Sequence, residues 1–170
     1  AGSLVAVAVA RDGSQKLIFY DINHHSVYKI VTFPIGVALQ NPSWDADKSK
    51  VIFTKVDSGG KSLCTYSLVD GSITTLLESD LADIANPQLV NGYAVFSSYS
   101  STVNNLYAID TVSRSLYRIT NSRFGAQYPS AMSQGTQLLY SKYTPSGYRI
   151  AMIQFREQTD KNAISAHDLG

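Results

Sequence analysis

The sequence predicts an all-β fold: a β-propeller of about four blades, each made of four antiparallel strands. Three observations predict it. The chain repeats itself with a period of about 44 residues, prolines recur at the same point of the repeat, and helical periodicity is nearly absent. Four short strands in about 40 to 45 residues are typical of a propeller blade. A β-sandwich also has closely spaced strands, but it has no reason to repeat its sequence.

The repeat is clearest between residues 17–30 and residues 106–119, which align without a gap. The two segments share a leucine, an aspartate, a serine, a tyrosine and an isoleucine at matching positions. The second segment begins 89 residues after the first, which is two periods of about 44.5, so we expect one more copy between them. Residues 66–76 form that copy in a slightly shortened version. We therefore expect 17–30 and 106–119 to be equivalent strand–turn–strand units two blades apart.

A second landmark confirms the period. Pro42, Pro87 and Pro129 each stand shortly before a turn and a run of β-forming residues. The turn after Pro87 is Asn91-Gly92, a strong hairpin signal because both residues tolerate a positive φ. In the first copy the residues Asp12-Gly13 precede a similar run. Each complete unit is therefore predicted as a proline-led strand followed by three more strands.

These landmarks divide the chain into four blades and a tail. The predicted blades are 1–36, 37–81, 82–124 and 125–157, and residues 158–170 form a tail or the start of a next blade. The first copy lacks its proline-led strand, and the fourth weakens towards its end. Because an open arc of blades leaves strand edges and apolar faces bare, we expect missing blades of a larger propeller or a second chain to complete the ring, or the ends to pair. We expect the chain to be a mature or excised piece of something longer.

The residues that carry the repeat resemble those of TolB-like β-propellers. The TolB-like repeat runs approximately Pro-x-Trp-Ser-Pro-Asp-Gly-Lys-x-Ile-Ala-Phe, followed by an Ile-Tyr-x-x-Asp strand and a closing Leu-Thr. Residues 42–54 and 128–141 are similar to its first half, and residues 106–110 with 118–120 to its second half. The resemblance covers nearly the whole chain. It implies the propeller fold and a periplasmic or cell-envelope location. It does not imply one activity, because the repeat also occurs in propeller caps of serine peptidases.

Composition excludes several classes of function. The chain has 14 Lys and Arg against 13 Asp and Glu, and this net charge of +1 gives no reason to expect nucleic acid as a partner. Cys64 is the only cysteine, so an intrachain disulfide is impossible, and its apolar surroundings indicate a buried side chain. No apolar run approaches the roughly 20 residues that a membrane-spanning helix needs, so no transmembrane segment is predicted.

We expect no catalytic residues, metal ligands or cofactor in this chain. No Gly-x-Ser-x-Gly motif occurs, and Cys64 has no basic neighbours that would activate a thiol. His24 and His25 are adjacent, so on a strand they would point to opposite faces and chelate one metal poorly. By the repeat alignment they fall in an exposed hairpin turn. Asp21 and Asp110 recur at equivalent positions, which indicates that they accept hydrogen bonds from the backbone of a turn.

The predicted binding site is the segment between the third and fourth blades, which departs most from the repeat. Loops from an outer strand to the next inner strand converge near the propeller axis, on the face where propellers usually bind. Arg123, Phe124, Gln127 and Tyr128 are the residues that we expect to contact a partner, since arginine and aromatic side chains are typical binding hot spots. Ordinary loop packing is the alternative explanation for this segment.

Two functions remain open from the sequence. The first is a non-enzymatic module of a bacterial envelope protein that binds a protein partner through the loop face or the central channel. The second is the propeller domain of a larger hydrolase, such as a serine peptidase or a carbohydrate-active enzyme, whose active site lies elsewhere. The sequence on either side of this chain in the full-length protein would discriminate between them.

Overall fold

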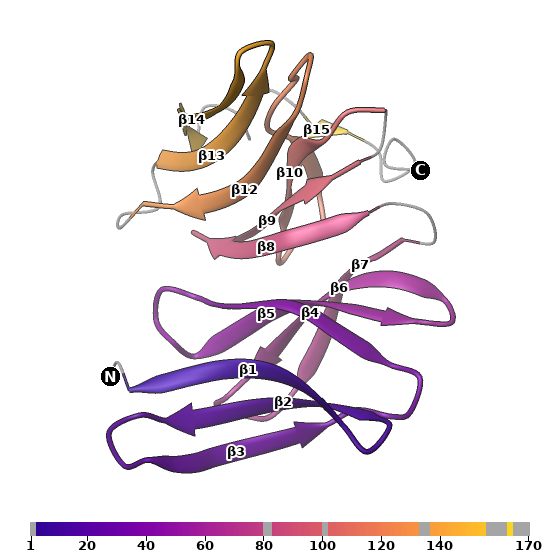
Figure 1. Ribbon diagram of the computed structural model, residues 1–170, viewed down its shortest axis with the longest axis vertical. Helices are drawn as coiled ribbons and strands as arrows, with labels where there is room; N and C mark the ends of the chain where they lie inside the picture. The colour runs from indigo at the N-terminus through magenta and orange to yellow at the C-terminus, as the bar shows by residue number, and fades with distance from the viewer. Residues whose placement is uncertain (1–2, 80–82, 100–101, 133–136, 156–162, 165–170) are drawn as a thin grey trace.

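The computed structural model describes residues 3–79, 83–99, 102–132, 137–155 and 163–164. These residues form four antiparallel sheets that follow one another in chain order along the long axis of the molecule (Figure 1). The all-β propeller fold predicted from the repeat is confirmed, and each sheet is one blade. None of the described segments is a helix that is long and apolar enough to cross a membrane.

The blades differ in the number of their strands. Blade 1 contains β1 (Leu4–Arg11), β2 (Ser14–Asp21) and β3 (Ser26–Thr32). Blade 2 contains β4 (Ala38–Trp44), β5 (Lys50–Asp57), β6 (Gly60–Ser67) and β7 (Ile73–Ser79). Blade 3 contains β8 (Ile84–Val90), β9 (Tyr93–Ser98), β10 (Asn105–Asp110), β11 (Leu116–Arg118) and β15 (Ala163–Ile164). Blade 4 contains β12 (Ala126–Ala131), β13 (Gln137–Thr144) and β14 (Gly147–Gln154).

Strand β15 joins a distant part of the chain to blade 3. It pairs antiparallel with β11, so the last described residues add a fifth strand to that sheet. The sequence had assigned these residues to a tail or to the start of a next blade. The remainder of 158–170 lies outside the described residues.

The proline-led strands are the first strands of blades 2, 3 and 4. Each of them contains a bulge at the proline, and the residue before the proline has a positive φ: 51° at Asn41, 52° at Asn86 and 56° at Tyr128. Proline supplies no N–H to a strand ladder, so a bulge at the edge of the sheet accommodates it without losing a paired donor. Since β8 packs on β4 and β12 on β8, these first strands form the inner row of the propeller.

The two segments that align in the sequence are equivalent in the structure. Residues 17–30 form β2 and β3, and residues 106–119 form β10 and β11, each pair joined by a hairpin. His25 and Arg114 occupy the same turn position, with φ of 48° and 64°. Blade 1 is therefore made of the second, third and fourth strands of the repeat, and among the described residues it lacks the inner, proline-led strand.

Apolar side chains fill the space between successive blades. Three separate clusters lie between blades 1 and 2, 2 and 3, and 3 and 4; Phe19 and Phe53 belong to the first, Phe96 and Tyr107 to the second. Blades 2 and 3 consequently bury both faces, because successive side chains of a strand point to opposite sides. Cys64 is buried in the first cluster, as its sequence context predicted.

Candidate functional site

The loop between β11 and β12, residues 119–125, is fixed by one buried amide. Asn105 is 1% exposed, and its Oδ1 accepts hydrogen bonds from the Thr120 hydroxyl at 3.0 Å and from the Ser122 N–H at 2.7 Å. The Thr120 hydroxyl oxygen in turn accepts the Leu106 N–H at 2.9 Å. Because buried polar groups must be paired, this network holds the loop backbone in one conformation.

Gly125 attaches the same loop to blade 4. Its φ is +144°, a backbone conformation that residues other than glycine rarely adopt, and a Cβ built there would lie 3.6 Å from the Cβ of Tyr143. The Gly125 carbonyl accepts the Tyr143 N–H at 2.9 Å, and the Gly125 N–H donates to the Ser122 hydroxyl at 3.0 Å. The loop is thus bonded to blade 3 at one end and to β13 at the other.

Two of the predicted residues project from this fixed loop. Arg123 is exposed and Phe124 is 45% exposed, and the guanidinium carbon of Arg123 lies 5.4 Å from the centre of the Phe124 ring. A cation at this distance from a ring is attracted by the negative face of the π system, which keeps the two side chains together. They present a planar cation and an aromatic surface side by side to the solvent.

Gln127 makes different contacts from the first pair. Its side chain is half-buried, accepts a hydrogen bond from the Asn104 amide at 3.5 Å and donates one to the Tyr148 hydroxyl at 3.3 Å. The rings of Tyr143 and Tyr148 lie 4.9 Å apart, so Gln127 borders an aromatic pair on blade 4. Sequence reasoning missed these tyrosines, although their positions on either side of the short Pro145-Ser146 turn indicate a cross-strand pair.

Tyr128 lies on the inner strand of blade 4. It is 58% exposed and has the left-handed φ that asparagine has at the equivalent positions, Asn41 and Asn86. A bulky residue rarely adopts this conformation, whereas asparagine tolerates it. Backbone strain of this kind clusters at functional sites. The structure thus brings Arg123 and Phe124 into contact, while Gln127 and Tyr128 lie on β12, the strand that follows the loop.

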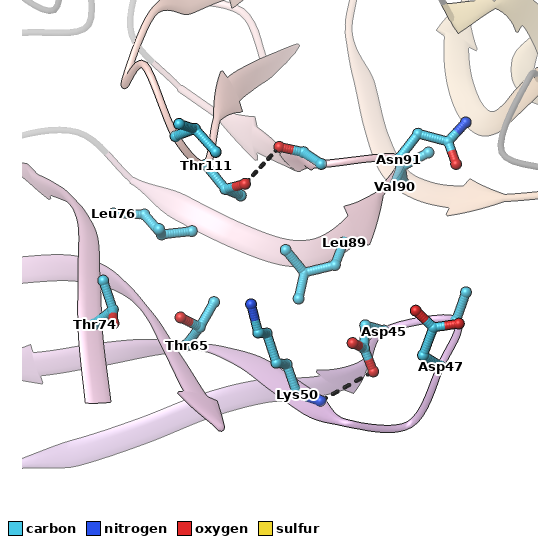
Figure 2. A pocket seen from close by; sticks show the side chains of 13 residues that line it. Asp45, Asp47, Lys50, Thr65, Thr74, Leu76, Leu89, Val90, Asn91 and Thr111 are labelled. Atoms are coloured by element: carbon cyan, nitrogen blue, oxygen red, sulfur yellow. Dashed lines mark hydrogen bonds between the residues drawn. The ribbon is translucent and has the colours of Figure 1, made fainter. Parts of the chain in front are cut away.

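A pocket of about 480 Å³ lies between blades 2 and 3 (Figure 2). It is lined by the β4–β5 turn, by parts of β6 and β7, and by the turns of blade 3. The Asp45 carboxylate accepts three hydrogen bonds, from the Ser49 N–H and hydroxyl and from the Lys50 N–H. These bonds stabilise the β4–β5 turn. Thr111 donates its hydroxyl to the Gly92 carbonyl at 2.7 Å. This pocket forms only between blades, so its lining residues could not be recognised as a group in the sequence.

Asp21, Asp70 and Asp110 each lie at a hairpin turn and have pKa values below the usual range. Hydrogen bonds from the Ser72 N–H and hydroxyl lower the pKa of Asp70 to about 2, and those from the Ser113 and Val112 N–H groups lower the pKa of Asp110. A hydrogen bond with the His24 side chain, at 2.8 Å, lowers the pKa of Asp21. The Asp21 carboxylate also accepts the Asn23 and His24 N–H groups, at 2.9 and 3.2 Å, so the predicted role of Asp21 and Asp110 as acceptors for the turn backbone is confirmed.

Several solved propeller structures are similar to this chain. TolB from Acinetobacter baumannii superposes with a TM-score of 0.76 at 14% identity, over 92% of this chain and 39% of its own. A protein described as TolB from Agrobacterium tumefaciens also gives 0.76 at 14% identity, over 97% of this chain and 61% of its own. A puromycin hydrolase gives 0.68 at 13% identity, over 97% of this chain and 27% of its own.

These similarities establish the fold, which is that of the TolB propellers. The identities are low, so the likeness extends to architecture alone. The chain spans less than two thirds of the length of each of these proteins. The sequence matches no model of a protein family and no curated protein.

Proposed function

We propose that this chain is a non-enzymatic protein-binding module of a bacterial envelope protein, and that it binds its partner through the loop that carries Arg123 and Phe124. The observation that supports this most is an exposed arginine stacked beside an exposed phenylalanine on a backbone that Asn105 and Gly125 hold fixed. Arginine and aromatic residues are enriched among binding hot spots. A pre-organised loop loses little entropy on binding, so more of the contact energy remains as affinity.

Gln127 and Tyr128 extend this surface along β12. Gln127 is held between Asn104 and Tyr148, so its position is set before a partner arrives. Tyr128 keeps an aromatic side chain exposed on the inner strand in a conformation that favours asparagine. Retaining a strained tyrosine there is consistent with a binding role, since packing alone would favour the asparagine of the other blades.

The envelope location is part of the same proposal. It rests on the likeness to TolB propellers, which is a likeness of fold. The balanced charge of the chain fits a protein partner better than a polyanion.

The proposal is tested in two stages. A photo-crosslinking residue in place of Phe124 should capture a partner from a periplasmic extract, and mass spectrometry identifies it. The purified partner is then titrated calorimetrically with the wild-type chain and with the double variant Arg123→Ala/Phe124→Ala. We expect the Kd to rise at least about 30-fold, which corresponds to about 2 kcal/mol.

A matched control separates binding from general surface effects. Val112 and Arg114 are likewise an exposed apolar residue and an exposed arginine, but they lie on the β10–β11 hairpin, at the other end of β11. The double variant Val112→Ala/Arg114→Ala should bind as the wild type does. An unchanged Kd for the Arg123/Phe124 variant, or its unfolding in circular dichroism, would show that these side chains do not form a binding site.

A second function is supported by the likeness to a puromycin hydrolase, of which this chain matches 27%. In that case the chain is the propeller domain of a larger hydrolase, with the active site elsewhere. A hydrolase domain encoded beside this segment in the full-length gene would favour it. For the non-enzymatic module we expect the purified chain to show no turnover of peptide, ester or glycoside substrates; turnover lost through one substitution here would contradict it.

A further inference from the structure

The charges of this chain are distributed unevenly along it, although they nearly balance overall. Between Asp110 and Glu157 the sequence has six Lys and Arg and no Asp or Glu, so all 13 acidic residues lie outside this segment. The described part of the segment includes β11, the loop 119–125 and blade 4. This part of the molecule therefore carries a local positive charge that the net charge of +1 conceals.

Two of these cations lie opposite each other in blade 4. Lys142 on β13 is the register partner of Arg149 on β14, so the two side chains lie on the same face of the sheet. Both side chains are exposed, and neither takes part in an ion pair within the described part of the chain. Like charges directly opposite each other destabilise a sheet. The fold therefore retains a repulsive pair that a bound anion would relieve.

Lys142 also lines a small pocket between blades 3 and 4. The loop 119–125 forms one wall of this pocket through Asn121 and Ser122, and Tyr140 lies beside Lys142 on the opposite wall. The volume of the pocket is about 260 Å³. Drug-sized ligands occupy pockets of about 300 to 1,000 Å³. The space therefore suits one group of the size of a side chain rather than a whole small molecule.

The polar groups of the pocket offer hydrogen-bond donors. Burial raises the pKa of Tyr140, so its hydroxyl stays protonated at neutral pH and is able to donate. Within the described part of the chain, no hydrogen bond engages the Tyr140 hydroxyl, the Asn121 amide or the Lys142 ammonium. No carboxylate of the described residues lines the pocket. Since hydrogen bonds to an ionised group are stronger than those between neutral groups, these donors fit an anion supplied from outside.

We propose that this pocket binds a carboxylate from an acidic segment of the partner protein, with Lys142, Tyr140 and Asn121 as the donors. The inference rests on the proposed function, because the loop that carries Arg123 also forms a wall of the pocket. Arg123 directly follows Ser122, and its guanidinium is suited to pair with a second carboxylate of the same segment. A nucleic acid fits less well, because the sequence pI is about 8.0 and nucleic-acid-binding domains usually exceed about 9.

A labelled hexaglutamate peptide tests the pocket directly, and hexaglutamine is the uncharged control probe. We expect fluorescence anisotropy with the full chain at about 20 mM salt to show saturable binding of hexaglutamate only, and about 200 mM salt to weaken it. Lys142→Gln should raise the Kd at least about tenfold, and Lys142→Arg should keep it within about twofold of the wild type. Lys48→Gln removes an equally exposed lysine charge from the β4–β5 turn and should leave the Kd unchanged.

Three results would overturn the inference. One is the absence of saturable hexaglutamate binding, and another is an equal Kd for the wild type and Lys142→Gln. The third is an oligothymidylate of equal charge that binds at least as tightly as hexaglutamate, because the pocket would then not select an acidic protein segment.

The stability of Lys142→Gln gives a measurement that needs no ligand. Its urea midpoint at low salt should be higher than that of the wild type, because the repulsion from Arg149 is removed. A lower midpoint would show that Lys142 stabilises the fold, and it would also overturn the inference.

The partner captured through position 124 separates this inference from the proposed function. We expect Lys142→Gln to raise the Kd of that partner at least about tenfold as well. If the Kd depends on Arg123 and Phe124 but not on Lys142, the proposed function stands and the inference is wrong. If hexaglutamate binds through Lys142 while Arg123→Ala/Phe124→Ala leaves partner binding unchanged, the carboxylate pocket is supported and the proposed loop site is wrong.

Discussion

Replacing Asn105 with alanine should destabilise the protein much more than the same change at Asn104. Asn105 is buried and satisfies two donors of the loop, the Ser122 N–H at 2.7 Å and the Thr120 hydroxyl at 3.0 Å. A buried donor left without a partner costs about 1 to 3 kcal/mol. Two such donors therefore give an expected loss of about 3 kcal/mol in the free energy of unfolding.

Asn104 is the matched control for this prediction. Its side chain makes one hydrogen bond of 3.5 Å to Gln127 and is only partly buried, so Asn104→Ala should cost less than about 1 kcal/mol. Urea unfolding followed by circular dichroism measures both values, and for a chain of this size 3 kcal/mol corresponds to a fall in Tm of about 6 to 12 °C. Equal losses for the two variants would refute the view that Asn105 fixes the loop.

Two further predictions concern the turns and the inner strand. The pKa values of Asp21, Asp70 and Asp110 are lowered in the folded state, so their contribution to stability is complete above their unfolded pKa, about 3.9, and is lost as the pH falls through the folded values, about 2 for Asp70. Urea midpoints measured between pH 6 and pH 2 should fall at the acid end, and Asp70→Asn should flatten this fall; an identical pH profile for the variant would contradict it. Tyr128→Asn should raise the free energy of unfolding by about 0.5 to 1 kcal/mol, because asparagine adopts the left-handed φ more easily; a loss of stability would mean that the tyrosine ring packs in the folded state.

The repeat made most of the fold predictable from the sequence. The alignment of residues 17–30 with residues 106–119 located β2–β3 and β10–β11. In each pair the first strand ends in an aspartate and the turn passes through a residue with a positive φ, and this local structure requires the same residue types each time. The prolines located the inner strands for a similar reason, since a residue without an N–H is tolerated only where the ladder is interrupted. Local chemistry that recurs can be recognised without knowing the tertiary structure.

The candidate site was only partly predictable. The departure of residues 121–128 from the repeat pointed to the loop, but the sequence did not show that Asn105, 15 residues before Thr120, fixes it. That contact joins β10 to the loop that follows β11, so it depends on a strand register that residue types alone do not give. The Tyr143–Tyr148 pair differs from this case, because the two tyrosines flank one short turn and their spacing in the sequence could have predicted the contact.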